Sequence, residues 1–187
     1  HAIELLHAGS LIIDDIQDDS KVRRGARAYH LEHGIATAIA TGNWLYFKPL
    51  SILRQLAIEP ERKASIALRY CEVMEEAHCG QLADVAIDMT EIPRQQVAAV
   101  CSYAIRQKTG ALSGFAIELG GLIAGCDSTL ADHLRQLGYA FGCVLQKLDD
   151  LGNAAGVREP AKALEDLSYR RPSWVWAVAA SHGSEAD

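Results

Sequence analysis

The sequence lacks the features that mark secreted, membrane-spanning or nucleic-acid-binding proteins. Its five cysteines are an odd number and form no C-x-x-C pair, so we expect reduced thiols in a cytoplasmic protein rather than disulfides. The longest apolar stretch, Gly110 to Gly125, is interrupted by Glu118 and is too short to cross a bilayer comfortably, so no stable membrane insertion is expected. The formal net charge of -6 argues against binding of nucleic acid.

Strand-like alternation of apolar and polar residues is almost absent, whereas apolar residues recur at helical spacing along the chain. No low-complexity tract or linker divides its 187 residues, and a composition that is 49% hydrophobic can bury a sizeable core. We therefore predict an all-α protein with a single domain, 1–187. Helices are expected at 1–19, 31–49, 61–83, 94–106, 109–124, 128–152 and 164–181, with loops at 20–29 and 153–160.

One short pattern of oxygen-bearing side chains occurs twice, at positions i, i+1 and i+4. Its members are Asp14, Asp15 and Asp18 in the first copy and Asp149, Asp150 and Asn153 in the second. On a helix the first and last members lie on one face, one turn apart, where carboxylates repel each other unless cations lie between them. Hard oxygen ligands favour Mg²⁺, which completes its shell with water and phosphate oxygens. The pattern therefore predicts a diphosphate held by magnesium between two helices.

Together with three further motifs, the first acidic cluster resembles the trans-isoprenyl diphosphate synthase family. The string HAIELLHAGSLIIDDIQDDSKVRRGARAYH is followed, in the family's order and approximate spacing, by GQLAD at 80–84, KTG at 108–110 and FGCVLQKLDDLGN at 141–153. A lone D-D-x-x-D would be weak evidence, because acidic runs are usually solvated surface. The resemblance implies a helical bundle of the isoprenoid synthase type, with a central cavity between the helices that bear the two Asp-rich motifs.

The resemblance also implies roles for individual residues. The implied metal ligands are Asp14, Asp18, Asp149 and Asn153, with Asp15 and Asp150 supporting the same ions; the implied diphosphate contacts are Arg23, Arg24, Gln81 and Lys108, and the implied catalytic residues are Lys108, Thr109 and Gln146. Arginine suits phosphate because its planar fork makes bidentate contacts. Taken alone, the two arginines would be read as exposed loop residues, and the two glutamines as core hydrogen-bonding groups.

Small side chains precede the first acidic cluster. Ser10 and Gly9 lie four and five residues before Asp14, so on a helix they lie on the metal face, one turn deeper. Short-chain relatives carry a bulky aromatic residue there, and the resemblance therefore implies that Gly9 and Ser10 line an open tunnel and that the product is C20 or longer. The floor of the tunnel could be restored by Leu6, another turn down, or by Trp44 or Tyr46 from a neighbouring helix.

The chain departs from the family pattern in three places. Asn153 replaces an aspartate, which keeps an oxygen ligand but removes a charge. The segment after it only loosely resembles the family's lysine-bearing segment, so Lys162, Arg170 and Arg171 are either closing cations or solvent-exposed charges. The family's G-K-x-x-R segment belongs upstream of His1 and is absent from these residues, so either this sequence does not include N-terminal helices of the protein or the acceptor site is altered.

The implied reaction is a Mg²⁺-dependent head-to-tail condensation of an allylic diphosphate with isopentenyl diphosphate, carried out by a homodimer with an interface such as 31–47 and its neighbour. It needs no protein nucleophile. A terpene cyclase on the same scaffold is disfavoured by Val157, which stands where such enzymes carry glutamate, and a prenyltransferase with another acceptor would explain the missing segment. From a different class, a non-catalytic partner subunit would tolerate the altered second motif, although Asp149, Asp150 and Lys108 argue for catalysis.

Overall fold

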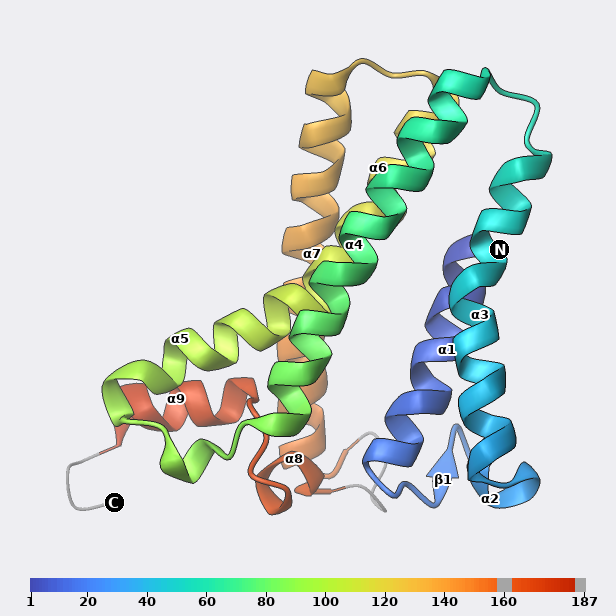
Figure 1. Ribbon diagram of the computed structural model, residues 1–187. Coiled ribbons are helices and arrows are strands. Elements are labelled where there is room, and N and C mark those ends of the chain that lie inside the picture. The colour runs from blue at the N-terminus through green and yellow to red at the C-terminus, as the bar shows by residue number, and fades with distance from the viewer. Residues whose placement is uncertain (158–162, 184–187) are drawn as a thin grey trace. The chain divides into compact units, whose positions relative to one another are not determined.

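A computed structural model describes residues 1–157 and 163–183, and these residues are mostly helical (Figure 1). The chain divides into two compact units, residues 1–67 and 68–187. In the described ranges the strands are confined to one small hairpin, in which β1 (Val22–Arg23) pairs antiparallel with β2 (Ala26–Arg27). The all-α fold class is therefore confirmed, while the single-domain organisation stays a prediction.

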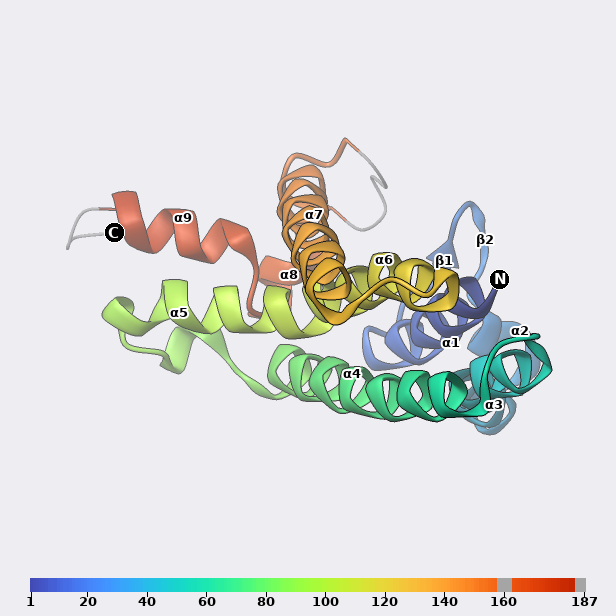
Figure 2. The same cartoon turned by 90° about the horizontal axis from the view of Figure 1, so that it is seen from above.

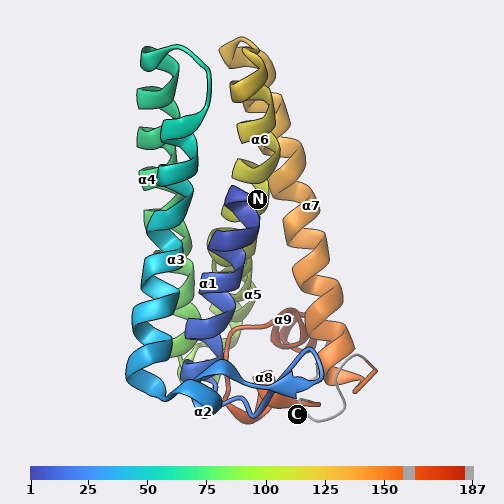
Figure 3. The same cartoon turned by 90° about the vertical axis from the view of Figure 1, so that its right-hand side faces the viewer.

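The first unit is built around two helices, α1 (Ala2–Gln17) and α3 (Ile35–Gln55), which lie side by side (Figures 1 and 3). Their contact is close because both carry glycine where they meet. A Cβ atom on Gly9 would lie 2.9 Å from the Gly42 carbonyl oxygen and 2.9 Å from the Leu45 Cβ. Apolar residues of both helices, including Leu6 and Ala38, are buried in this unit.

The predicted helix at 31–49 differs from the structure at both ends. A short helix, α2 (Tyr29–His33), ends at Gly34, whose φ of 82° is a left-handed conformation that residues with a side chain rarely adopt. The helix α3 then continues past Pro49 to Gln55. Proline disfavours the interior of a helix, but most helical stability in proteins comes from tertiary packing, which local propensity does not report.

The second unit begins within a long helix that starts in the first unit, α4 (Pro60–Ala86). Its other elements are η1 (Met89–Glu91), α5 (Arg94–Ile105), η2 (Arg106–Gly110), α6 (Ala111–Ala124), α7 (Ser128–Ala154), α8 (Glu165–Ser168) and α9 (Trp174–His182). The helices α6 and α7 pack along their lengths, and α5 lies beside α9, as Figure 2 shows from above. Buried residues of η1, α5 and α9, among them Met89, Cys101 and Ala177, form a common apolar cluster.

Two predicted boundaries in this unit need correction. The break expected between the helices at 94–106 and 109–124 is instead a π-helical turn, η2, which joins α5 to α6 without interruption. The helix expected at 164–181 is two short helices, because Pro172 has no N–H to continue a helix and Arg170 has a left-handed φ of 57°. Across the described parts of the chain, no helix is long and apolar enough to cross a membrane.

Candidate active site

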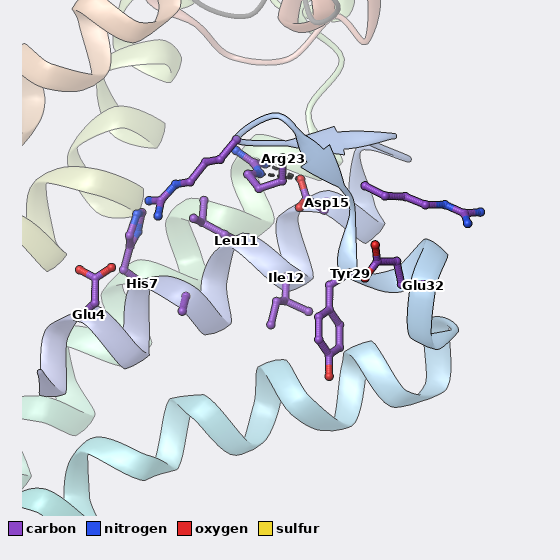
Figure 4. Close-up of a pocket in the computed structure, with 11 residues that line it drawn as sticks. Glu4, His7, Leu11, Ile12, Asp15, Arg23, Tyr29 and Glu32 are labelled. Carbon is purple, nitrogen blue, oxygen red and sulfur yellow. Dashed lines mark hydrogen bonds and ion pairs between the residues drawn. The ribbon is translucent and has the colours of Figure 1, made fainter.

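In the first unit the loop after α1 folds back over the first acidic cluster. The hairpin turn consists of Arg24 and Gly25, whose φ angles of 53° and 78° are both left-handed, as a two-residue type I′ turn requires. This turn brings the Arg23 side chain onto Asp15, with Nη2 at 2.5 Å and Nε at 2.9 Å from Oδ1 (Figure 4). The same guanidinium lies 3.5 Å from an oxygen of Asp14.

The carboxylates of Asp15 and Asp14 differ in how accessible they are to a ligand. Asp15 is only 2% exposed and accepts both hydrogen bonds from Arg23. The side chain of Asp14 is 19% exposed, so its carboxylate is more open to solvent. Asp18 caps the end of α1 by donating its backbone N–H to the Asp14 carbonyl oxygen. Asp19, one residue further, is exposed and pairs with Lys21 at 2.6 Å.

A pocket in this unit lies along the face of α1 that carries Asp15 (Figure 4). Its polar lining residues are Glu4, His7, Asp15, Arg23, Arg24, Arg27, Tyr29 and Glu32, and its apolar ones are Ala8, Leu11 and Ile12. Burial, followed by the positive charge of Arg24, lowers the pKa of His7 below its ordinary value, so the imidazole is neutral at pH 7. The pocket therefore offers guanidinium groups beside carboxylates, which suits a ligand carrying negative charge and bound cations.

The structure gives Gly9 and Ser10 different surroundings from the open tunnel that was expected of them. Neither residue lines the pocket. Space beyond the Gly9 Cα is filled by α3, and a Cβ atom added at Gly9 would lie 3.4 Å from the Tyr46 ring. The Ser10 hydroxyl donates to the His7 carbonyl oxygen at 2.8 Å. The small size of Gly9 is thus explained by the contact between α1 and α3.

In the second unit three of the predicted residues form a continuous hydrogen-bonded chain. The Thr109 hydroxyl lies 2.6 Å from the Gln146 carbonyl oxygen Oε1, and the Gln146 amide donates to Asp150 Oδ1 at 2.8 Å. The other oxygen of Asp150 accepts the Trp174 backbone N–H at 2.7 Å. Both carboxylate oxygens of this buried aspartate are therefore bound by protein donors. Burial raises the pKa of Asp150, with Asp149 adding to the rise and the donated hydrogen bonds opposing it.

Lys108 lies beside this chain and pairs with an acidic residue of α4. Its Nζ atom is 2.7 Å from Asp84 Oδ2, and Arg171 Nη1 is 3.7 Å from the same oxygen. Gln81 is half-buried one turn earlier on α4. The backbones of α4 and η2 touch here, since a Cβ atom on Gly80 would overlap the Lys108 backbone nitrogen. Isolated π-helical turns such as the one that carries Lys108 frequently occur at functional sites.

Two acidic residues of this region were not singled out from the sequence. Asp84 ends the GQLAD motif, and its three-residue spacing from Gln81 on a helix is the signal that could have indicated a role. Asp166 lies in the segment that resembles the family only loosely. Burial raises the pKa of Asp166 to about 7, with the negative charges of Asp150 and Asp84 adding to the rise and Lys108 opposing it. The pKa shift of Asp166 therefore places it electrostatically within this cluster.

The remaining predicted residues of this unit differ in how exposed they are to solvent. Asp149 is exposed near the end of α7, and Asn153 is half-buried one turn later. Of the three candidate closing cations, Arg170 pairs with Asp88, with Nη1 3.1 Å from Oδ2. The second candidate, Arg171, is not a solvent-exposed charge, because its side chain is only 12% exposed. Lys162 lies outside the described residues.

The acidic clusters suit magnesium by their chemistry. In the regions that the structure describes, no three histidine, cysteine or acidic side chains converge to hold a metal ion. Mg²⁺ is usually bound through one or two carboxylates, with water and substrate phosphates completing the shell, so a dedicated protein cage is not required. Asp14 and Asp18 in the first unit, and Asp149 and Asn153 in the second, supply hard oxygen donors of this kind.

Among known proteins the chain is similar in sequence to several geranylgeranyl diphosphate synthases. The chain is 32% identical over 152 residues to geranylgeranyl diphosphate synthase from Methanosarcina mazei, covering 80% of this chain and 45% of that protein. It is 33% identical over 168 residues to the geranylgeranyl diphosphate synthase of Sulfolobus acidocaldarius, covering 86% of this chain and 49% of that protein. The chain thus spans about half the length of the curated relatives it matches.

The fold is shared with solved structures. The crystal structure of a polyprenyl synthetase from Streptomyces coelicolor superposes with a TM-score of 0.83 at 28% identity, covering 99% of this chain and 54% of that one. A geranylgeranyl pyrophosphate synthase from Lactobacillus brevis superposes with a TM-score of 0.81 at 29% identity, covering 97% and 55% of the two chains. The polyprenyl synthetase family profile matches residues 1–187 from end to end. The predicted resemblance is confirmed, and the chain belongs to the polyprenyl synthetase family.

Proposed function

We propose that this chain belongs to a Mg²⁺-dependent trans-prenyltransferase that condenses an allylic diphosphate with isopentenyl diphosphate, releasing pyrophosphate. The observation that carries the proposal is the hydrogen-bonded chain from Thr109 through Gln146 to Asp150, beside the cation Lys108. It joins residues from two separate motifs, KTG and the second Asp-rich motif, into one connected group. Family membership supplies the reaction type, and the names of the relatives support a prenyl diphosphate as product.

In the proposed reaction the cationic side chains bind the diphosphate of the substrates. Arg23 and Arg24 serve the two diphosphates from the hairpin, and Gln81 and Lys108 donate to diphosphate oxygens from the second unit. Asp14, Asp18, Asp149 and Asn153 would hold the magnesium ions, while Asp15 and Asp150 keep neighbouring groups in place. Bound Mg²⁺ would neutralise the charge that grows on the departing pyrophosphate.

Thr109 has a defined part in this scheme. Its hydroxyl lies 2.6 Å from the Gln146 carbonyl oxygen, an acceptor, so the hydroxyl proton is committed to that contact. The lone pairs of the Thr109 oxygen can then face a developing allylic cation. Gln146 is itself fixed by Asp150, which keeps the orientation of the threonine hydroxyl. The double bond of isopentenyl diphosphate attacks the cation, and the released pyrophosphate accepts a proton from the condensed cation, which restores an alkene.

Three finer points belong to the proposal. A product of C20 or longer is supported by relatives named as geranylgeranyl diphosphate synthases, and less by Gly9, whose small size has a packing explanation. A homodimer through α3 is supported by Trp44 and Phe47, which are 58% and 69% exposed. A cytoplasmic location is supported by free thiols at the five cysteines.

The test is incubation of the purified protein with Mg²⁺, radiolabelled isopentenyl diphosphate and allylic diphosphates of five, ten and fifteen carbons. We expect a labelled, longer prenyl diphosphate, and we expect Asp14→Asn to lower kcat at least about 100-fold because a ligand to the charge-neutralising metal is altered. Asp19→Asn is the matched control, since Asp19 is exposed and pairs only locally with Lys21. A cyclised hydrocarbon, or no product from a folded protein, would contradict the proposal; the latter would favour a non-catalytic subunit.

A further inference from the structure

One carboxylate of α4 binds two cations that come from distant parts of the sequence. Oxygen Oδ2 of Asp84 is 2.7 Å from Lys108 Nζ and 3.7 Å from Arg171 Nη1. All three side chains are largely withdrawn from solvent, with exposed fractions of 14% for Asp84, 29% for Lys108 and 12% for Arg171. Two like charges this close repel each other strongly where little water screens them, so the shared carboxylate is what keeps them together.

The segment that carries Arg171 is held by Asp88 and Met89, which follow the C-terminal end of α4. The Met89 backbone N–H donates to the Arg170 carbonyl oxygen at 2.9 Å, and Arg170 Nη1 lies 3.1 Å from Asp88 Oδ2. Arg170 itself has a left-handed φ of 57°, a conformation that a residue with a side chain adopts at a cost. The contacts of Arg170 with Met89 and Asp88, rather than the backbone preference of Arg170, therefore hold the segment that carries Arg171 in place.

We propose that Asp84 is a positioning residue that holds Lys108 and Arg171 side by side as a two-cation clamp for one diphosphate group. The inference deepens the proposed function and rests on it. In this scheme Asp84 does not itself contact the substrate. Its contribution is to fix both cations where negative charge grows on the leaving group, which stabilises the transition state more than the bound substrate.

This role predicts a specific kinetic signature. Asp84→Asn leaves both positive charges available to attract the diphosphate but no longer fixes their positions. We expect kcat to fall about 10-fold to 100-fold while KM for the allylic diphosphate changes less than about threefold. Asp84→Glu, which restores the charge on a longer side chain, should recover part of kcat. The matched control is Asp132→Asn on α7, whose side chain is 48% exposed and pairs locally with Arg135, and which should leave kcat within about twofold.

A double-mutant cycle separates positioning from a general effect on the fold. Because Asp84 acts through Lys108 as well as through Arg171, Asp84→Asn should lower kcat by a clearly smaller factor in a Lys108→Gln background, where only Arg171 remains to be positioned. Equal losses in both backgrounds, or a KM increase that matches the loss in kcat, would overturn the proposal. Thermal unfolding of each variant shows whether it is folded.

Binding of inorganic pyrophosphate in the presence of Mg²⁺ distinguishes failure of this inference from failure of the proposed function. Titration calorimetry needs no turnover. With both cations fixed, the unaltered protein should bind pyrophosphate, and Lys108→Gln should weaken binding about 10-fold in the unaltered background but less than about threefold in the Asp84→Asn background. Additive losses would refute the clamp even if condensation is observed, whereas coupled losses without condensation would refute only the proposed reaction.

Discussion

The close approach of α4 to η2 makes Gly80 the position where the smallest substitution should have a large effect. In Gly80→Ala the added methyl group would overlap the Lys108 backbone nitrogen and would lie 2.6 Å from the Gln107 carbonyl carbon and 2.8 Å from the Gln107 Cβ. The first two are backbone atoms of a helical turn, so they cannot swing aside as the end of a flexible side chain would.

Two opposing effects decide whether Gly80→Ala raises or lowers the free energy of unfolding. Alanine is favoured over glycine in a helix interior by about 1 kcal/mol. Overpacking in a well-packed region typically costs about 1–3 kcal/mol, and contact with two backbone atoms places Gly80→Ala at or above the upper end. We therefore expect a net loss of about 2 kcal/mol, which for a chain of this size lowers Tm by about 4–8 °C.

The chain offers a matched control for Gly80→Ala. At Gly120, in the interior of α6, an added Cβ atom would have no neighbour within 4 Å, so only the helix-propensity gain applies. Gly120→Ala should raise Tm by about 2–4 °C. Circular dichroism or calorimetry measures both changes. If Gly80→Ala raises Tm as much as Gly120→Ala, the close packing of α4 on η2 is not what requires glycine there.

Three further changes test other parts of the structure. Because burial raises the pKa of Asp166 from its ordinary 3.8 to about 7, the folded state holds this proton more tightly than the unfolded chain; stability without metal should fall by up to about 4 kcal/mol as the pH rises from about 4 to 8. Urea unfolding at several pH values should show this loss reduced in Asp166→Asn, and an unchanged pH profile would contradict it. Asp127 caps α7 by accepting the Leu130 N–H at 2.8 Å, so Asp127→Ala should cost about 1 kcal/mol in urea unfolding and Asp127→Asn much less, whereas equal losses would argue against the cap. Gly9→Phe should lower Tm well below that of Ser10→Phe, because its ring meets α3; a Gly9→Phe protein of normal stability would refute this account.

Much of the helical structure could be predicted from the sequence because apolar periodicity reports which face of a segment is buried. The helix expected at 128–152 is observed at Ser128–Ala154, with Asp127 as its cap. Periodicity does not report backbone conformations that depend on single residues. It therefore missed the break at Gly34 and the interruption near Arg170, where left-handed φ angles end one helix and redirect the chain.

The chemical identity of the site was contained in the order of the residues along the chain. Two acidic patterns, an R-R-G turn and a K-T pair indicate oxygen ligands and phosphate-binding cations, since those side chains have few other uses in combination. The order of the residues does not tell which of these side chains contact one another in the folded protein. The pairs Arg23 with Asp15 and Thr109 with Gln146, and the sharing of Asp84 by two cations, arise from a hairpin turn and from helix crossings that bring remote residues together. Such contacts depend on distances through space, which spacing along one chain does not encode, and for that reason Asp84 and the packing role of Gly9 emerged only from the tertiary structure.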